Sequence, residues 1–173
     1  MSVTAMSVPT QPGVRENVSA EEWQTRVDLA ALYRLVAMEG MTDLAGTHIS
    51  ARVPGTEDHF LLNPFGLMFE EVTASNLVKV DVNGEKVMDT PFPVNPAGFT
   101  IHSAVHMARP DVQCIAHTHT AAGMAFSSVE TEVLPISQTS CYFYNRTGYH
   151  GWEGISLDID ERERIVRDLG DNR

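Results

Sequence analysis

Four short segments between residues 47 and 88 constrain the fold most, because each has strand character and each ends at a turn signal. Most of them alternate apolar and polar residues, which is typical of a strand with one buried face. Pro-Gly, Asn-Pro and Asn-Gly pairs separate them, and Asn-Gly is a strong hairpin signal. The pattern therefore predicts a mainly antiparallel sheet with strands at 47–53, 59–62, 77–82 and 85–88.

Helical segments flank this predicted sheet. Ser19 can cap a helix and Glu22 can complete a capping box, after which apolar residues recur at helical spacing up to Gly40. Residues 97–108 predict a second helix that ends before Arg109-Pro110. We also expect a closely packed helix at 120–128, a charged helix at 160–169, strands at 112–119, 133–136 and 141–144, and a flexible arm over residues 1–18.

In this chain of 173 residues, one domain over residues 19–173 follows the arm, because neither a repeat nor an internal linker divides it. Helices that cover a mostly antiparallel sheet place it in the α/β class. The net charge of −11 argues against a partner that is a nucleic acid or an anionic membrane. No apolar run is long enough to span a membrane, and the two cysteines, Cys114 and Cys141, are expected to be reduced thiols. These features predict a cytoplasmic protein.

Residues 117–119 (His-Thr-His) are the most informative chemical motif. Side chains two residues apart on a strand project from the same face, so His117 and His119 can reach one metal ion. Two ordinary half-buried histidines are the alternative interpretation. A catalytic metal site also needs a third protein ligand and an open coordination position.

Other candidate sites are weaker. His102 and His106 lie four residues apart on the predicted second helix, and we expect His102 to be a hydrogen-bonded core residue and His106 to lie nearer the surface. Residues 46–52 and 63–66 combine small residues with polar donors, as anion-binding loops do, although ordinary turn formation is the simpler interpretation. The aromatic residues between 142 and 152 indicate packing or an interface.

Several motifs occur together in the order that a known family has. They are residues 46–52 (GTHISAR), 63–66 (NPFG), 71–75 (EVTAS), His102 followed by 108–111 (ARPD), 117–120 (HTHT) and 134–138 (LPISQ). From about Arg26 onward the chain resembles the class II aldolase/adducin family, most closely its adducin-like bacterial branch. The resemblance implies a three-layer α/β/α fold around a central, mainly antiparallel sheet of nine strands. It also implies a homotetramer with active sites near the subunit contacts.

The resemblance further implies a divalent metal held by three histidines. Two of them come from the His-x-His strand and correspond to His117 and His119. The metal is expected to be Zn²⁺, with Fe²⁺ or Mn²⁺ as alternatives, and to polarise the carbonyl of a small substrate. On the substrate side, the matching positions are His48, Asn63, Gly66 and Gln138.

Departures from the aldolase pattern leave the reaction open. Phe99 stands where the aldolases are expected to carry an acid/base Glu, and His48 replaces an Asn of their phosphate loop. The third metal histidine of the family is expected beyond Arg173, so the domain is expected to be C-terminally incomplete; His48 is the best spare ligand and His150 a weaker one. The leading hypothesis is a metal-dependent carbon–carbon lyase or decarboxylase of a small carbonyl or carboxylate compound. The alternatives are a non-catalytic adducin-like oligomerisation or binding module, and an Fe(II)-dependent oxidative decarboxylase.

Overall fold

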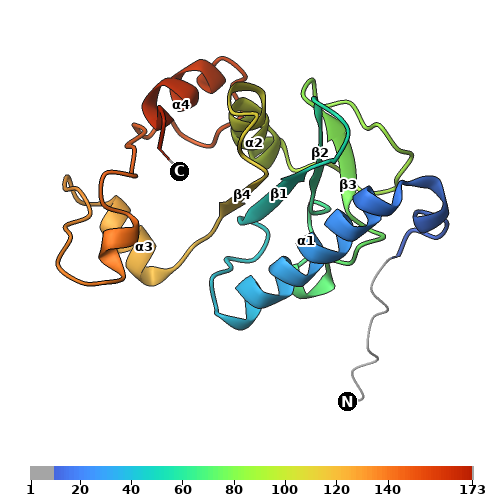
Figure 1. Cartoon of the computed structure of the whole chain (residues 1–173), viewed down its shortest axis with the longest axis horizontal. Helices are drawn as coiled ribbons and strands as arrows, with labels where there is room; N and C mark the ends of the chain where they lie inside the picture. The colour runs from blue at the N-terminus through green and yellow to red at the C-terminus, as the bar shows by residue number, and fades with distance from the viewer. Residues whose placement is uncertain (1–9, 173) are drawn as a thin grey trace.

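A four-stranded antiparallel sheet forms the centre of the computed structural model, which describes residues 10–172. The strands lie in the order β3-β2-β1-β4, so β3 and β4 are the two edges (Figure 1). Their bounds are β1 His48–Arg52, β2 His59–Leu62, β3 Val78–Asp81 and β4 Cys114–His117. Strand pairing thus agrees with the turn signals, except that residues 85–88 contribute one isolated bridge, between Val80 and Lys86, instead of a strand.

Successive side chains along each strand point to opposite faces of the sheet, so the sheet separates two apolar clusters. On one face, Ile49 and Leu61 belong to a cluster with Leu29 and Tyr33 of α1 (Ala20–Met38). On the other face, Phe60, Leu62 and Val80 pack with Phe99 of α2 (Pro96–Ala108). The sheet therefore lies between two helices, which confirms the α/β/α layering for the part of the chain that the structure describes.

Helix α1 begins at the predicted cap. The Ser19 side chain accepts a hydrogen bond from the Glu22 backbone N–H (3.0 Å), but the Glu22 carboxylate does not serve the cap. It pairs instead with Arg26 (3.0 Å) and Lys79 (2.7 Å), and Arg26 donates to the Leu77 carbonyl (2.9 Å). Arg26 is fully buried, so this network joins α1 to β3 inside the core.

The predicted arm over residues 1–18 can be followed from residue 10, because residues 1–9 lie outside the described part. Val14 is buried, Arg15–Asn17 forms a short 3-10 helix, and the Arg15 guanidinium lies 5.2 Å from the centre of the Trp23 ring. Val14 and Arg15 therefore contact the domain, since an apolar residue close to the helix can be buried beside it, and the flexibility of the arm stays a prediction.

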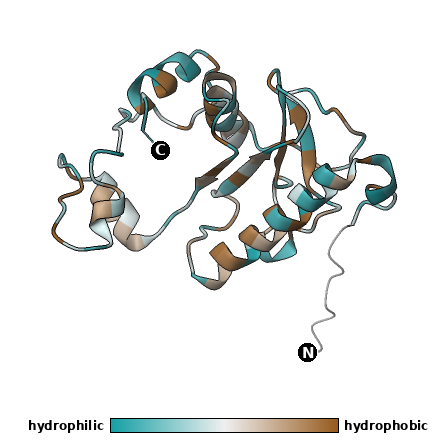
Figure 2. Cartoon of the chain, in the orientation of Figure 1, coloured by the Kyte–Doolittle hydropathy of each residue, from teal (hydrophilic) through white to brown (hydrophobic). Residues whose placement is uncertain are grey.

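The chain after His106 is organised differently. Helices α3 (Ala121–Ser127) and α4 (Glu161–Leu169) form close to the predicted places, but α3 has no buried residue, so the expectation that it packs closely is wrong for the described residues. Figure 1 shows α3 and the segment after it apart from the sheet, and Figure 2 shows that apolar residues also occur there. The strands predicted at 133–136 and 141–144 do not form; a 3-10 helix, Ser140–Tyr142, replaces the second.

Helix α4 returns to the main body and contacts α2. The Arg162 guanidinium lies 4.8 Å from the centre of the Phe99 ring, and Arg109 donates to the carbonyls of Gly170 and Asn172 (both 3.0 Å). His150 bonds Asp168 of α4 at 2.7 Å and Glu161 at 3.3 Å. Within residues 10–172, every helix is too short or too polar to span a membrane.

Candidate functional site

The pairing of β1 with β4 places two histidines side by side. In the antiparallel register, His48 lies directly opposite His117. Opposite residues on neighbouring strands project from the same face, and the two rings are stacked, with centroids 4.5 Å apart and planes inclined by 20°. His48 and His117 are 69 positions apart in sequence, so this pairing brings together two motifs that the sequence presents separately.

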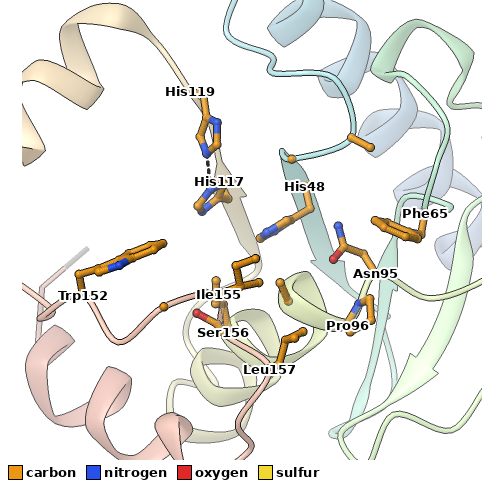
Figure 3. A pocket seen from close by; sticks show the side chains of 15 residues that line it. His48, Phe65, Asn95, Pro96, His117, His119, Trp152, Ile155, Ser156 and Leu157 are labelled. Carbon is orange, nitrogen blue, oxygen red and sulfur yellow. Dashed lines mark hydrogen bonds between the residues drawn. The ribbon is translucent and has the colours of Figure 1, made fainter.

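His119 continues the same face beyond the end of β4. Its Nε2 atom lies 2.9 Å from Nε2 of His117, and the planes of the two rings are inclined by 61° (Figure 3). The other ring nitrogen of His119, Nδ1, bonds the Asp43 carboxylate at 2.9 Å. A carboxylate on Nδ1 favours the tautomer with the proton there, so Nε2 of His119 is the acceptor in its contact with His117 and carries the lone pair that metal-bound histidines use. The prediction that His117 and His119 share a face is confirmed.

Helix α2 supplies two further histidines beneath β1. His102 Nε2 lies 2.9 Å from His48 Nδ1, and His106 Nε2 lies 2.9 Å from the Ser50 hydroxyl. Both rings are buried, so the expectation of a core position is confirmed for His102 and wrong for His106. The cause is helical spacing: residues four apart share one face of α2, and this face packs against the sheet.

Burial favours the neutral form of the His48, His102 and His117 imidazoles. Desolvation, reinforced by His117 and His119, lowers the pKa of His48 to about 3. Desolvation with nearby His48 and His106 holds the pKa of His102 well below its ordinary value. The pKa of His117 is also lowered, by burial first and by His119 second. Unprotonated imidazole is the form that binds metals.

A pocket of about 500 Å³ opens beside these rings. His48, His117 and His119 line it on one side, and the segment 152–157, which includes Trp152 and Leu157, lines it on another (Figure 3). Most of the remaining lining is apolar, including Phe65, Pro96 and Ile101, and within residues 10–172 neither Lys nor Arg contributes to it. An apolar pocket with a few converging polar groups is typical of a site for a small molecule.

Glycine at position 98 allows the approach of α2 to β1. A Cβ atom at Gly98 would lie 2.9 Å from Cγ of His48, closer than real Cβ contacts allow. Gly98 is in the first turn of α2, where its N–H donates to the Asn95 side chain at 3.1 Å. The imidazole of His48 thus occupies the space that any larger residue at position 98 would fill.

The other predicted site residues are not among those that line this pocket. Asn63 is buried, with its side-chain oxygen 2.9 Å from the Tyr33 hydroxyl, and Gly66 has a positive φ of 92° at an exposed turn. Gln138 is exposed in the segment after α3. His150 bonds two carboxylates of α4, and Phe99 is a core residue. Of the predicted set, the structure brings together His48, His117 and His119.

The donors in place fit a divalent metal in part. Two imidazole Nε2 atoms converge at the edge of a pocket, and one of the rings is oriented by a carboxylate, which suits Zn²⁺, Fe²⁺ or Mn²⁺. Within residues 10–172 no group of three or more His, Cys, Asp or Glu is arranged to hold a metal ion. The described residues therefore bring together two imidazole nitrogens of the kind that bind a metal ion, without a third such group beside them.

Sequence reasoning missed three contributors to the site. Asn95 and residues 154–157 line the pocket, and Gly98 supports His48. The Asn-Pro pair at 95–96 is a helix-start signal that could have revealed Asn95. Nothing local points to residues 154–157, because their position depends on the return of α4 to α2.

Comparison with known proteins assigns the family. The family profile described as Class II Aldolase and Adducin N-terminal domain matches residues 27–173. A Pseudomonas aeruginosa protein whose name provisionally assigns it to aldolase class 2 is 60% identical over 91% of this chain, and the chain spans 60% of its length. Alpha-adducin of Rattus norvegicus is 46% identical over 84% of the chain, which covers 20% of that protein.

A solved structure supports the same assignment. The L-fuculose 1-phosphate aldolase from Glaciozyma antarctica PI12 superposes with a TM-score of 0.77 at 35% identity, over 95% of this chain and 62% of that chain. The chain thus spans about three fifths of the bacterial relative and of the solved aldolase. The family profile, the relatives and the α/β/α layers agree, and the protein belongs to the class II aldolase/adducin family.

Proposed function

We propose that the chain carries part of the active site of a metal-dependent class II aldolase-like lyase. The observation that carries this proposal is the convergence of His117 Nε2 and His119 Nε2, 2.9 Å apart, beside a pocket of about 500 Å³. His117 and His119 would hold the ion, and Asp43 would orient His119. A divalent metal bound there, Zn²⁺ first and Fe²⁺ or Mn²⁺ as alternatives, supplies Lewis-acid polarisation of a carbonyl oxygen.

The lining of the pocket supports a small carbonyl or carboxylate substrate. Phosphate groups are usually bound by Arg, Lys or clustered backbone N–H groups, and within the described chain no Lys or Arg lines the pocket. The apolar side chains that line the pocket, which include Phe65 and Leu157, suit a compact molecule whose oxygen atoms contact the histidines. Carbon–carbon cleavage or decarboxylation is the reaction class that we propose for it.

The proposal also includes the oligomeric state of the protein and its location in the cell. Many large apolar side chains after His106 are exposed, among them Ile136 and Trp152, with exposed fractions of 84% and 87%. Exposed apolar surface of this kind is typical of protein–protein contacts. We propose a homo-oligomer, a tetramer, in the cytoplasm.

Metal analysis of the purified chain tests the proposal. We expect added Zn²⁺ to bind the chain at a one-to-one ratio in a calorimetric titration, with the modest affinity of an incomplete ligand set, and this binding to be lost in the double variant His117→Ala/His119→Ala. His150→Ala is the matched control, because His150 bonds the carboxylates of Asp168 and Glu161 in α4 and is not among the residues that line the pocket. Retention of the ion in the double variant, or no ion in the unaltered chain, contradicts the proposal.

A non-catalytic binding module is the second candidate, and one observation favours it. Position 99, where an acid/base was expected, holds a Phe that lies in the core, and within residues 10–172 the pocket lining contains no Asp or Glu. Adducin belongs to the same family. A chain that binds zinc and oligomerises, but releases no product from any of a panel of hydroxy-acid and keto-acid aldols, would support this candidate over the lyase.

A further inference from the structure

The pocket beside the histidines has two sides of different chemistry. On one side, the three imidazoles offer nitrogen atoms to the polar end of a ligand. On another side, the segment 152–157 contributes the large apolar side chains of Trp152, Ile155 and Leu157 (Figure 3). The volume of about 500 Å³ is in the range of pockets that hold drug-sized ligands, so a carbonyl or carboxylate group fills only a small part of it. The apolar side therefore faces a part of the ligand for which the histidines do not account.

Helix α4 holds the segment 152–157 in place. The Glu153 carboxylate accepts two hydrogen bonds from the Arg164 guanidinium, from Nε at 2.8 Å and from Nη2 at 2.6 Å. The Ser156 hydroxyl donates to the Glu161 carboxylate at 3.1 Å. Glu153 and Ser156 are thus bonded to α4, and the apolar side chains beside them are left to line the pocket.

A ligand that offers only oxygen atoms would leave this apolar side in contact with water. Within residues 10–172 the pocket lining contains no Lys, Arg, Asp or Glu, and the Ser156 hydroxyl is already bonded to Glu161. Removal of apolar surface from water is favourable roughly in proportion to its area. A ligand with an apolar group beside its carbonyl or carboxylate therefore gains contacts here that a purely polar ligand does not make.

We propose that residues 152–157 form an apolar specificity wall, and that the substrate of this pocket carries a branched alkyl or aryl group beside its carbonyl or carboxylate. The apolar group packs against Trp152, Ile155 and Leu157 while the oxygen atoms contact the histidines. Arg164 is the positioning residue that holds the wall. The inference rests on the proposed function for the polar end of the ligand, but the contact between the apolar group and the wall needs no bound metal.

Fluorescence of Trp152 tests this contact directly. The chain has two tryptophans, so Trp23→Phe in the full chain leaves Trp152 as the single reporter. The probes are 3-phenyllactate and lactate, which share a hydroxyl and a carboxylate and differ by a phenyl group, and each is titrated with and without Zn²⁺. We expect 3-phenyllactate to change the emission of Trp152 and to bind at least about tenfold more tightly than lactate in both states.

The outcomes of this titration separate the wall from the metal site. Equal affinities for the two probes, or an emission of Trp152 that 3-phenyllactate does not change, overturn the inference. If Zn²⁺ does not bind while 3-phenyllactate is still preferred over lactate, the metal proposal fails and the apolar wall is supported.

Alanine variants at exposed positions separate the wall from the surface around it. Leu157 is 62% exposed, so Leu157→Ala should fold, and it should weaken 3-phenyllactate binding about tenfold and lactate binding less than about twofold in calorimetric titrations. Ile136→Ala is the matched control, because Ile136 is 84% exposed in the same region and does not line the pocket. Equal weakening of both probes in Leu157→Ala contradicts the inference. If Leu157→Ala leaves both affinities unchanged and instead dissociates an oligomer in sedimentation, the segment is a subunit contact and the inference is wrong.

Variants of α4 test how the wall is held. Arg164→Ala removes both bonds to Glu153 and should lower the ratio of the 3-phenyllactate and lactate affinities severalfold, with Zn²⁺ affinity unchanged. Arg164→Lys keeps a cation for Glu153 and should restore part of this ratio. Arg167→Ala is the matched control on the same helix, because the Arg167 guanidinium bonds Asp168 and not the wall. A ratio that is the same in Arg164→Ala as in the unaltered chain would contradict the positioning role of Arg164.

Discussion

The chain before and after His106 uses apolar residues in two different ways. Before it, Leu29, Tyr33, Ile49, Leu61 and their neighbours fill two layers against the sheet. In the chain after His106, Glu161 is the one buried residue among those that the structure describes. Large apolar side chains are exposed along much of this segment. The first region is stabilised by its own contacts, whereas the second presents a surface that other protein can cover. The candidate site lies where the two regions meet.

The largest expected difference between the two regions is in the free energy of unfolding that is lost when a charged side chain is removed. Arg26 is fully buried and bonds Glu22 and two carbonyls, so Arg26→Ala leaves Glu22 with Lys79 alone. Loss of one partner of a buried pair costs about 3–5 kcal/mol. Arg167, whose side chain is 67% exposed, is the matched control, and Arg167→Ala should leave the free energy of unfolding almost unchanged. Urea denaturation monitored by circular dichroism measures both, and equal losses would show that the network is not part of the stable core.

A pair of leucines tests whether the second region is covered in solution. Leu61 is fully buried, so Leu61→Ala should cost about 2–5 kcal/mol in the free energy of unfolding. Leu134 is 58% exposed in the isolated chain, so Leu134→Ala should cost less than about 0.5 kcal/mol there. Urea denaturation at several protein concentrations makes the comparison. A cost for Leu134→Ala that grows with concentration would show that a second copy covers this segment.

The smallest expected effect is a pH-dependent contact in the second region. Burial lowers the pKa of His150, but its bonds to Asp168 and Glu161 raise it more, so the net pKa lies above the ordinary value. The protonated form is therefore favoured by folding, and its stabilisation is present below the ordinary pKa and lost as pH rises through the raised one. The charge of Glu153, which pairs with Arg164 at 2.6 Å, also interacts with that of His150.

Hydrogen exchange measures this contact. Protection of the amides of α4 should fall as the pH rises above the ordinary pKa of histidine and through the raised pKa of His150, after correction for intrinsic exchange, while protection in α1 stays constant. His150→Gln should abolish the pH dependence in α4. A fall in protection that persists in His150→Gln would assign the effect to another group.

Local patterns predicted much of the first region. The turn-forming residue pairs correctly predicted the bounds of three strands. Ser19 predicted the start of α1, and the Arg-Pro pair at 109–110 predicted the end of α2. The same reasoning failed for residues 133–136 and 141–144, since a strand forms only where another strand pairs with it, and no described segment does so there. It also placed His106 too near the surface, because the identity of the buried face depends on what α2 packs against.

The sequence alone determined that His117 and His119 share a face, because the period of a strand is two residues and needs no distant contact. It also determined the family, through several motifs in order. Only the tertiary structure decided that His48 lies opposite His117, that His102 bonds His48, and that Gly98 leaves room for the ring. These contacts join residues about 50–70 positions apart, and strand register and helix docking, which no local pattern encodes, bring them together.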